Sequence, residues 1–241
     1  MLDVGAGIGG PLRSIASLSG ASITGLNNNA HQVDRGNEIL SQCPHLRNCS
    51  MIKGDFMELP FADHTFDHAY QIEATCHAPD PSGAYGEVLR TLKPGGLFAS
   101  YEWCLTDTFD PNNPEHRDIK EHIMVGNGLP ELRHHSVVIK ALEDAGFEVL
   151  EAEDLALKSE VPWYQPIDPN RRLRLEQFKT TWLGRNITHY AVWLLEKLGI
   201  APKGTMSTSS FLKHGADGLV AGGKAGVYTT MYFTLCRRPA Q

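Results

Sequence analysis

The sequence has no long hydrophobic run. None of its apolar stretches approaches the ~20 consecutive residues that a membrane-spanning helix requires. Strand-like residues follow Met1 directly, which leaves no room for the charged and apolar regions of a secretory signal peptide. We therefore expect no transmembrane segment and no signal peptide, and we expect any membrane contact to be peripheral.

Cysteine is sparse and shows no ligand spacing. The five cysteines are scattered along the chain without a Cys-x-x-Cys pair or a Cys/His pattern, so they indicate neither a disulfide framework nor a zinc site, and a reducing compartment fits. His134 and His135 are adjacent but have no third ligand at metal-binding spacing, and we expect solvated loop histidines there.

Positive charge is also in short supply. The 22 Lys and Arg residues face 28 Asp and Glu residues, which gives a net charge of -6. Nucleic-acid binding draws on clustered Lys and Arg, so we expect no nucleic-acid partner. The one dense cationic stretch, Arg171, Arg172 and Arg174, is interpreted as a solvated helix face rather than an anionic-lipid contact.

What the chain has is a regular alternation of apolar runs with helix-like stretches, in a composition that is 41% hydrophobic. This alternation predicts an α/β, Rossmann-like fold with a mainly parallel sheet. Strands are expected at Met1–Val4, Ser22–Leu26, Ser50–Lys53, Phe66–Glu73, Gly96–Trp103, Phe147–Leu157 and Tyr228–Cys236. Helices are expected at Gly10–Leu18, Ala30–Ser41, Ser82–Leu92 and Ser136–Ala145, the last closed by Gly146.

The rhythm breaks between Lys158 and Gly226. A proline-punctuated loop is followed by an amphipathic stretch over Leu173–Leu198 and a second helix near Ser209–Gly218. We interpret this part as an α-rich insertion ahead of the last strand, and a candidate wall or lid of a pocket. The predicted division is a core domain over 1–157 and a C-terminal region over 158–241. A charged stretch from Asp110 to Lys120 is interpreted as an exposed helix face.

The most informative feature is the glycine-rich turn between the first strand and the first helix. Gly5, Gly7 and Gly9 tolerate positive φ and carry no Cβ, so the backbone can turn tightly and approach a ligand closely. Pro11 suits the first turn of the helix that follows. The turn predicts a nucleotide-like cofactor, but its spacing alone is a weak signal.

Polar side chains follow the second and third strands. Asn27 and Asn28, with Gln32 one turn later, can donate to and accept from ribose hydroxyls; alternatively the asparagine run makes an Asx turn and caps the next helix. Asp55 can accept from an adenine amine while Phe56 packs on the ring, or the two are a capping carboxylate and a core phenylalanine. In register with the glycine turn, we favour the ligand-binding interpretation of Asp55 and Phe56.

Several segments resemble the sterol 24-C-methyltransferase family, and the resemblance covers nearly the whole chain. In sequence order, these segments are Leu2–Pro11, Gly25–Asn29, Gly54–Met57, Ile72–Pro79, Leu92–Gly96, Tyr101–Trp103, Gly218–Lys224 and Met231–Phe233. The resemblance implies a class I methyltransferase fold with an antiparallel last strand, S-adenosylmethionine as cofactor and a sterol side-chain double bond as acceptor. Asp3 and Glu73 join the expected cofactor-binding residues on this basis.

The implied reaction requires stabilisation of a cation rather than activation of a nucleophile. An alkene is already nucleophilic, positive charge then migrates into the sterol side chain, and a proton finally leaves; carboxylates and aromatic faces stabilise such charge. We expect Glu73 to face the reacting groups, His77 or Glu102 to accept the final proton, and Tyr101 and Trp103 to line the acceptor site. His77 as a structural histidine and Glu102 in a buried ion pair are the alternatives.

The sequence indicates the residues that bind the acceptor less clearly than those that bind the cofactor. Trp163, Tyr164 and Trp182 either line a sterol channel or belong to the core. Family members carry an N-terminal segment that the resemblance implies contacts the sterol, and this sequence begins within its first strand, as expected of a truncated form. They also usually have Cys where Ala6 stands here, a tolerable change. Methylation of another apolar acceptor, or cofactor binding without catalysis, stays open.

The cellular setting follows from the acceptor. A sterol dissolves in membrane, so the resemblance implies peripheral association with the cytoplasmic face of the endoplasmic reticulum. Homo-oligomer formation is left open.

Overall fold

A computed structural model describes residues 1–170 and 181–240, and these form two compact units. The first, here the sheet unit, comprises Met1–Trp103, Arg133–Leu155 and the last strand from Thr230 onward. The second, here the helical unit, comprises Cys104–Leu132 and Ala156–Thr229. Each unit is described by itself.

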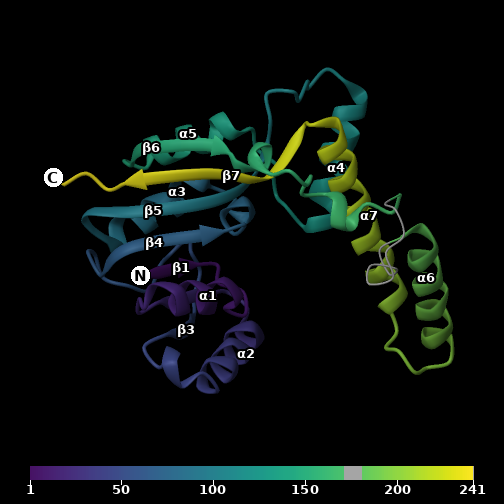
Figure 1. The fold of residues 1–241 in the computed structure, drawn as a ribbon, viewed down its shortest axis with the longest axis horizontal. Helices are drawn as coiled ribbons and strands as arrows, with labels where there is room; N and C mark the ends of the chain where they lie inside the picture. Colours follow the sequence, from purple (N-terminus) through teal and green to yellow (C-terminus); the bar gives the residue numbers. More distant parts are fainter. Residues whose placement is uncertain (171–180, 241) are drawn as a thin grey trace. The chain divides into compact units, whose positions relative to one another are not determined.

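The sheet unit contains a seven-stranded sheet in the order β3-β2-β1-β4-β5-β7-β6 (Figure 1). Neighbours from β3 to β5 pair in parallel, and β6 pairs antiparallel with β7. The predicted mainly parallel sheet with an antiparallel last strand is therefore confirmed. The strands are β1 (Leu2–Val4), β2 (Thr24–Asn27), β3 (Ser50–Lys53), β4 (Phe66–Ile72), β5 (Leu92–Leu105), β6 (Glu148–Asp154) and β7 (Tyr228–Arg237).

The start of β5 differs from the prediction at Gly96. β5 already pairs with β4 at Leu92, opposite Phe66, and the next aligned pair is His68 with Leu97. The extra residues form a bulge in which Gly95 has a φ of 76°, a conformation that glycine adopts without a steric penalty. The Lys-Pro-Gly-Gly segment therefore lies inside the strand, although such residues usually mark a turn.

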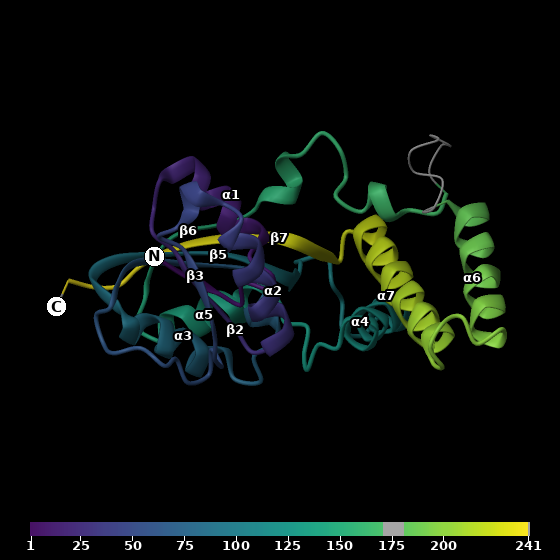
Figure 2. The ribbon, with the colours of Figure 1, turned by 90° about the horizontal axis from the view of Figure 1, so that it is seen from below.

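Four helices cover the sheet, with α1 on one face and α3 and α5 on the other (Figure 2). They are α1 (Gly10–Ser19), α2 (Ala30–Ser41), α3 (Pro81–Thr91) and α5 (His135–Asp144). The Asn29 side chain accepts a hydrogen bond from the Gln32 backbone N–H at the start of α2, so the asparagine run does cap that helix. Buried aliphatic residues of α1 and α2, including Leu12 and Val33, pack in one core cluster with Met51 of β3.

The opposite face of the sheet has an aromatic core. Tyr85 of α3 and Phe98 of β5 have ring centroids 6.1 Å apart, and Phe98 stacks on Phe147 at 5.5 Å. Tyr85 and Phe98 are fully buried, and burial of such large apolar surfaces is the main stabilising term for the sheet unit. The strand ends on which the predicted site lies therefore rest on a rigid support.

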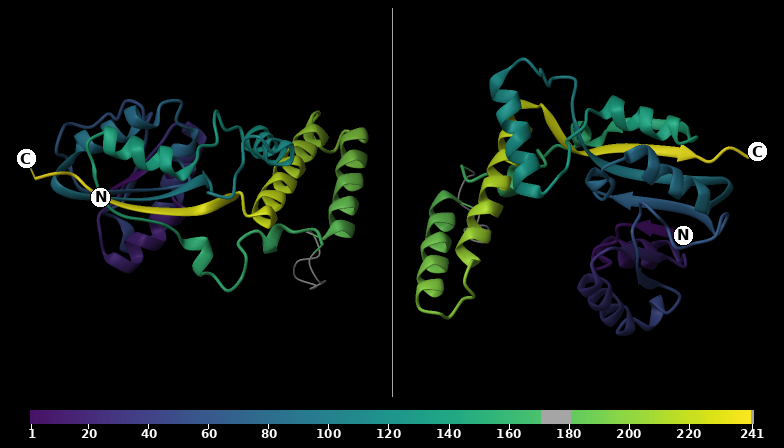
Figure 3. Two further views of the ribbon diagram at one scale, coloured as in Figure 1. Left: turned by 90° about the horizontal axis from the view of Figure 1, so that it is seen from above. Right: turned by 180° about the vertical axis from the view of Figure 1, so that it is seen from behind.

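The helical unit is built from α4 (Pro114–Asn127), α6 (Trp182–Lys197) and α7 (Thr205–Ala225), and α6 and α7 lie side by side (Figure 3). α4 packs tightly on α7, since a Cβ added to Gly126 would lie 2.1 Å from the Gly215 Cα atom. The predicted division at residue 157 is therefore corrected: residues 104–132 belong to the helical unit because α4 buries its apolar side on α7. The charged stretch from Asp110 to Lys120, predicted as an exposed helix face, is in α4 only from Pro114 onward. Glu115, Arg117 and Asp118 are exposed there, whereas His116 and Lys120 are half-buried.

Two predictions about helices fall on or near residues 171–180. The arginine cluster Arg171, Arg172 and Arg174, and the first part of the amphipathic stretch from Leu173, lie outside the described residues. Its remainder forms α6, and the second predicted helix is longer than Ser209–Gly218. Among the helices of the described residues, none has both the length and the apolarity to cross a membrane.

Candidate active site

A cavity of about 500 Å³ opens at the carboxyl ends of β1, β2 and β4. Because these parallel strands run side by side, the loops that follow them meet at one edge of the sheet, where open α/β sheets bind ligands. The cavity belongs entirely to the sheet unit. It is lined by Gly5, Asn27, Asn28, Gln32, Asp55, Phe56, Met57, Glu73, Ala74, His77 and Pro79.

The glycine turn forms the first wall. Gly5, Gly7 and Gly9 have φ values of 76°, 57° and 73°, a region that residues with a Cβ rarely adopt. Only Gly5 lines the cavity; a Cβ there would lie 2.3 Å from that of Ala74, so close packing of two backbone segments requires glycine. Gly7 faces open space, and Gly9 caps α1.

Asn27 connects the glycine turn to α2. Its Oδ1 accepts a hydrogen bond from the Gly7 N–H at 3.2 Å, and its Nδ2 donates to Gln32 Oε1 at 2.7 Å. Asn27 is buried, whereas Asn28 is exposed. The predicted ribose-binding residues thus meet at one wall of the cavity, with Asn27 in a supporting position and Asn28 and Gln32 reachable from it.

Asp55 and Phe56 form the next wall, after β3. Asp55 Oδ1 accepts a hydrogen bond from the Met57 N–H at 2.9 Å, which holds the loop after β3 in a tight turn. Asp55 is exposed, and Phe56 is half-buried beside it. An acceptor and a flat apolar ring next to each other suit an aromatic ligand that carries an amine.

Glu73 lies where β4 ends, in a strained backbone conformation. Its φ is 56°, in the left-handed region, and its N–H donates to the Tyr101 carbonyl at 2.9 Å. Burial raises the pKa of Glu73, and the Trp103 side chain acts in the opposite direction. Such strain is kept where the surroundings enforce it, and it is concentrated at functional sites. His77 lines the same part of the cavity.

Beneath this wall lies a buried polar network that the sequence did not predict. Gln71 Oε1 accepts from the Ala74 N–H at 2.8 Å, and Gln71 Nε2 donates to the Tyr101 carbonyl at 2.8 Å. The Thr75 hydroxyl donates to Glu102 Oε2. Gln71 near the end of β4 was the available signal for this network, since a buried amide needs hydrogen-bonding partners.

Glu102 was expected to accept the final proton or, alternatively, to form a buried ion pair, and it has no ion-pair partner among the described residues. Its side chain is 2% exposed and does not line the cavity, and its Oε1 accepts from the Trp103 N–H at 3.0 Å. Burial raises the pKa of Glu102 to about 7, and its hydrogen bonds offset part of that effect. Thr75 and Gln71 are its hydrogen-bonding partners in place of a cation.

Asp3 has a similar environment in β1. It is 2% exposed, accepts a hydrogen bond from the Tyr70 hydroxyl at 2.9 Å, and lies outside the cavity lining. Burial raises the pKa of Asp3 to about 7. The structure therefore places Asp3 under the glycine turn rather than at the surface of the cavity.

The aromatic candidates for acceptor binding do not line the cavity. Tyr101 packs on Phe233 with ring centroids 5.5 Å apart. In the helical unit, Trp163 packs on Tyr228 at 5.5 Å and on Tyr164 at 5.6 Å. These contacts support the core interpretation of Trp163 and Tyr164. Trp182 is 67% exposed, so its interpretation as core is wrong.

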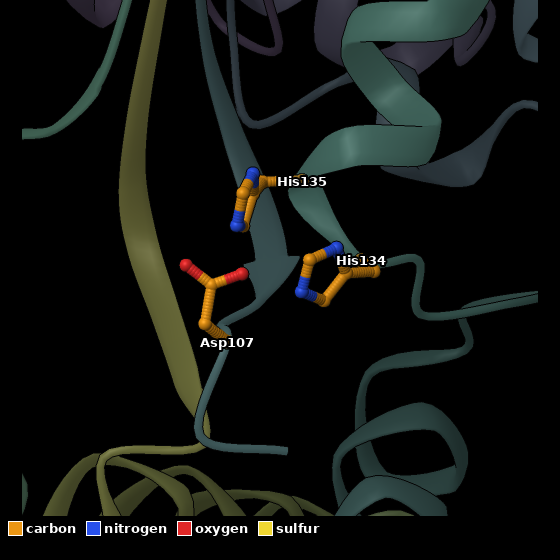
Figure 4. Close-up of side chains that lie close together, drawn as sticks. All are labelled: Asp107, His134 and His135. Atoms are coloured by element: carbon orange, nitrogen blue, oxygen red, sulfur yellow. The ribbon is translucent and has the colours of Figure 1, made fainter. Parts of the chain in front are cut away.

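The expectation of solvated loop histidines at positions 134 and 135 is also wrong (Figure 4). His134 Nδ1 accepts from the Ser136 N–H and so caps α5, and His135 stacks on Tyr232 at 4.8 Å. Both are half-buried because they close the start of a helix against the sheet.

Comparison with known proteins agrees with this geometry. Residues 2–100 match the family profile of a methyltransferase domain, and residues 175–240 match that of the sterol methyltransferase C-terminal region. The cycloartenol-C-24-methyltransferase 1 of Oryza sativa is 53% identical over 239 residues, which are 99% of this chain and 69% of that protein. The sterol 24-C-methyltransferase of Saccharomyces cerevisiae is 45% identical, over 99% of this chain and 64% of its own length.

Among solved structures, the geranyl diphosphate C-methyltransferase of Streptomyces coelicolor superposes with a TM-score of 0.67 at 16% identity, covering 98% of this chain and 69% of that one. At that identity the likeness shows the fold alone. Fold and site together define a methyltransferase of the class I type. The chain belongs to the sterol C-24-methyltransferase family.

Proposed function

We propose that this chain is an S-adenosylmethionine-dependent C-methyltransferase that adds a methyl group to carbon 24 of a sterol side-chain double bond. The observation that carries the proposal is the cavity in which the glycine turn, Asp55 and Glu73 converge at the carboxyl ends of parallel strands. Membership of the sterol C-24-methyltransferase family supports the choice of acceptor.

The residues of the cavity fit S-adenosylmethionine. A Cβ at Gly7 would stand in open space, so the turn leaves room for a ligand beside its backbone. In our proposal Asn28 and Gln32 bind the ribose hydroxyls, Asp55 and Phe56 bind the adenine, and Gly5 and Glu73 flank the amino acid part. The bound cofactor supplies an electrophilic methyl group on a positively charged sulfur.

Glu73 would provide the compensating negative charge. Partial burial raises the pKa of its carboxyl, although the residue as a whole is exposed, and a cation brought into the same cavity would favour the ionised form. Its strained backbone is held by the hydrogen bond to Tyr101, so the carboxylate need not reorganise when positive charge moves to the sterol.

The final proton would pass to His77. His77 lines the cavity, whereas Glu102 is enclosed by Thr75, Gln71 and Trp103. We assign Glu102 and Gln71 a positioning role: through Thr75 and Ala74 they hold the segment that carries Glu73 and His77. No residue needs to deprotonate the acceptor before attack, because the alkene is itself the nucleophile.

The same proposal includes the cellular setting. A sterol acceptor dissolves in membrane, so we propose peripheral contact with the cytoplasmic face of the endoplasmic reticulum. The finding that no described helix can cross a membrane is compatible with this arrangement.

The proposal is tested by calorimetric titration with S-adenosylmethionine beside a methyl-transfer assay with cycloartenol, lanosterol and zymosterol. Asp55→Ala should weaken cofactor binding about tenfold or more, as expected for loss of one hydrogen bond to a polar ligand group. Asp34→Ala removes an exposed carboxylate on α2 outside the cavity and should bind normally.

The outcomes separate the alternatives. Cofactor binding with transfer to a sterol supports the proposal. Binding without transfer to any sterol contradicts the catalytic part and favours a cofactor-binding form. Preference for a nicotinamide dinucleotide over S-adenosylmethionine contradicts both.

A further inference from the structure

Helix α6 carries the largest concentration of exposed apolar side chains on the described residues. Of its sixteen residues, only Gly184 is buried. Tyr190 is 68% exposed and Leu198, which follows the helix, is 63% exposed. We call the following residues the α6 stripe: Leu183, Ile187, Tyr190, Leu194 and Leu198.

The α6 stripe points away from the rest of the helical unit. Its members are three or four residues apart, so they share one side of the helix. The opposite side packs on α7, because Arg185 pairs with Asp217 and, together with His189, faces a small cavity against Leu212 of α7. Trp182 and Trp193 flank the stripe and are also exposed.

Such a surface is unusual for a protein that meets only water. Soluble proteins rarely expose contiguous apolar patches larger than a few hundred Å² unless the patch binds something. Aromatic rings beside an aliphatic stripe are characteristic of helices that lie in the interface of a lipid bilayer, with the rings at the level of the headgroups.

Charge indicates what covers the stripe. The chain as a whole is acidic, but the α6–α7 hairpin is basic, since residues 182–225 contain Arg185, Lys197, Lys203, Lys213 and Lys224 against Glu196 and Asp217.

Both acidic side chains of the hairpin are already engaged. Asp217 pairs with Arg185, and Glu196 accepts hydrogen bonds from the Gly204 and Met206 N–H groups, which lower its pKa. Lys224 pairs with Asp168, so Lys197, Lys203 and Lys213 stand against one remaining carboxylate, that of Glu196, and the hairpin keeps an excess of two positive charges beside its apolar stripe.

Two lysines lie at the tip of the hairpin. Lys197 and Lys203 line a cavity of about 710 Å³ together with Trp193 and Glu196, and their charges add to the effect of the backbone N–H groups that lower the pKa of Glu196. Two ammonium groups next to an indole ring suit a phosphate-bearing headgroup whose acyl chains continue along the stripe.

We propose that the α6–α7 hairpin is a membrane-docking surface: the α6 stripe inserts into the interface of a lipid bilayer while Lys197 and Lys203 bind anionic headgroups. The helix lies in the plane of the membrane. This inference rests on the proposed function only for the kind of membrane, and it assigns the contact to a surface distinct from the cofactor cavity. A second copy of the chain is the less suitable occupant, because it would bring the same lysines against each other.

The test is co-sedimentation of the full chain with phosphatidylcholine vesicles, with and without phosphatidylserine. We expect binding that increases with phosphatidylserine and decreases with salt. The double variant Ile187→Ser/Leu194→Ser should lower the partition coefficient about tenfold or more, as expected for two apolar side chains withdrawn from lipid. Leu18→Ser/Leu157→Ser is the matched control, because Leu18 and Leu157 are 89% and 85% exposed elsewhere.

A charge reversal tests the headgroup contact separately. Lys203→Glu should weaken binding to phosphatidylserine vesicles about tenfold and leave binding to pure phosphatidylcholine nearly unchanged. Lys140→Glu, on the exposed side of α5, should behave as the unaltered chain. Circular dichroism and thermal unfolding verify that each variant folds, which exposed positions should permit.

Three results would overturn the docking surface. The first is that the chain does not bind vesicles. The second is that Ile187→Ser/Leu194→Ser and its control bind vesicles equally. The third is that light scattering shows a dimer, which this double variant dissociates, and that the dimer does not bind vesicles. Cofactor titration of the same samples is independent of lipid, so failure of the docking surface and failure of the proposed function are distinguishable.

Discussion

The Thr75 hydroxyl donates a hydrogen bond to the buried carboxyl of Glu102, two residues before His77 enters the cavity wall. This bond joins the loop after β4 to the carboxyl-terminal part of β5, so the position of the cavity wall depends on a side chain that does not line the cavity. We therefore expect Glu102 and the equally buried Asp3 to affect the free energy of unfolding as well as the shape of the cavity wall.

The first prediction concerns pH. Burial raises the pKa of Glu102 from the usual 4.5, and that of Asp3 from 3.8, to about 7. Between the unfolded and folded pKa values the folded state binds more protons than the unfolded state, so the stability that each group contributes is present below pH 4 and is lost as the pH rises through 7. We expect the unfolding free energy of the unaltered chain, measured in urea, to decrease relative to Glu102→Gln by about 3 kcal/mol at most over this range.

Asp3→Asn should give a difference of the same sign and similar size, and the double variant should be nearly additive because the two residues lie on different strands. Glu143→Gln, an exposed carboxyl on α5, is the control. A difference between the unaltered chain and Glu102→Gln that does not depend on pH would contradict the prediction.

The second prediction concerns the glycine turn. In Gly5→Ala the added Cβ would meet that of Ala74 at 2.3 Å in addition to the cost of positive φ. Gly20→Ala has nearly the same φ, 70°, with nothing within 4 Å of the new Cβ, and thus isolates the backbone cost. Calorimetry should show cofactor affinity reduced at least about tenfold in Gly5→Ala only, because the wall of the cavity must move. Gly20→Ala should lose roughly 1–2 kcal/mol of stability, and Gly5→Ala should lose more because of the added clash.

Equal cofactor affinity in the two alanine variants would show that contact with Ala74 does not shape the site. Thermal unfolding of both variants provides the stability comparison.

The third prediction concerns Glu73. Glu73→Gln keeps the shape of the side chain but removes the charge, so kcat for methyl transfer should fall by about 100-fold while the dissociation constant of the cofactor changes by less than about threefold. Single-turnover and steady-state kinetics of methyl transfer, with cofactor titration of the same samples, measure the rate and the dissociation constant separately. Turnover equal to that of the unaltered protein would remove Glu73 from the mechanism.

The fourth prediction distinguishes packing from acceptor binding at Trp163. Its ring contacts Tyr228 and Tyr164, so Trp163→Ala should lower the free energy of unfolding by about 2–4 kcal/mol. Trp182→Ala, at an exposed position, should leave stability within about 0.5 kcal/mol. Chemical denaturation checks both values. A raised KM for sterol with unchanged stability in Trp163→Ala would instead support a channel wall.

Much of the sheet could be predicted because local patterns determine it. β3 and α2 have the predicted bounds, since strand and helix periodicities and the Asn29 cap are properties of short segments. The start of β5 could not be predicted, because Pro94 and Gly95 signal a turn and only pairing with β4 keeps them in a bulged strand.

The sequence predicted some of the residues at the cavity correctly and misplaced others. Asn28, Gln32, Asp55, Phe56, Glu73 and His77 line it as the order of strand ends suggested. Tyr101 and Glu102 lie within the neighbouring strand β5, where side chains alternate between the two faces of the sheet, and the register of β5 on β4 keeps both out of the cavity lining. The sequence alone does not specify that register.

By itself the sequence determined the succession of strands and helices, the glycine turn and the family to which the chain belongs. These depend on the conformational preferences of single residues and on the spacing of residues within short segments, both of which the sequence contains directly. Only the tertiary structure decided that Gln71 and Thr75 hydrogen-bond Glu102, that α4 packs on α7, and that the α6 stripe is exposed in the described part of the chain. Contacts of this kind join residues far apart in sequence, and their free energy depends on how whole elements pack.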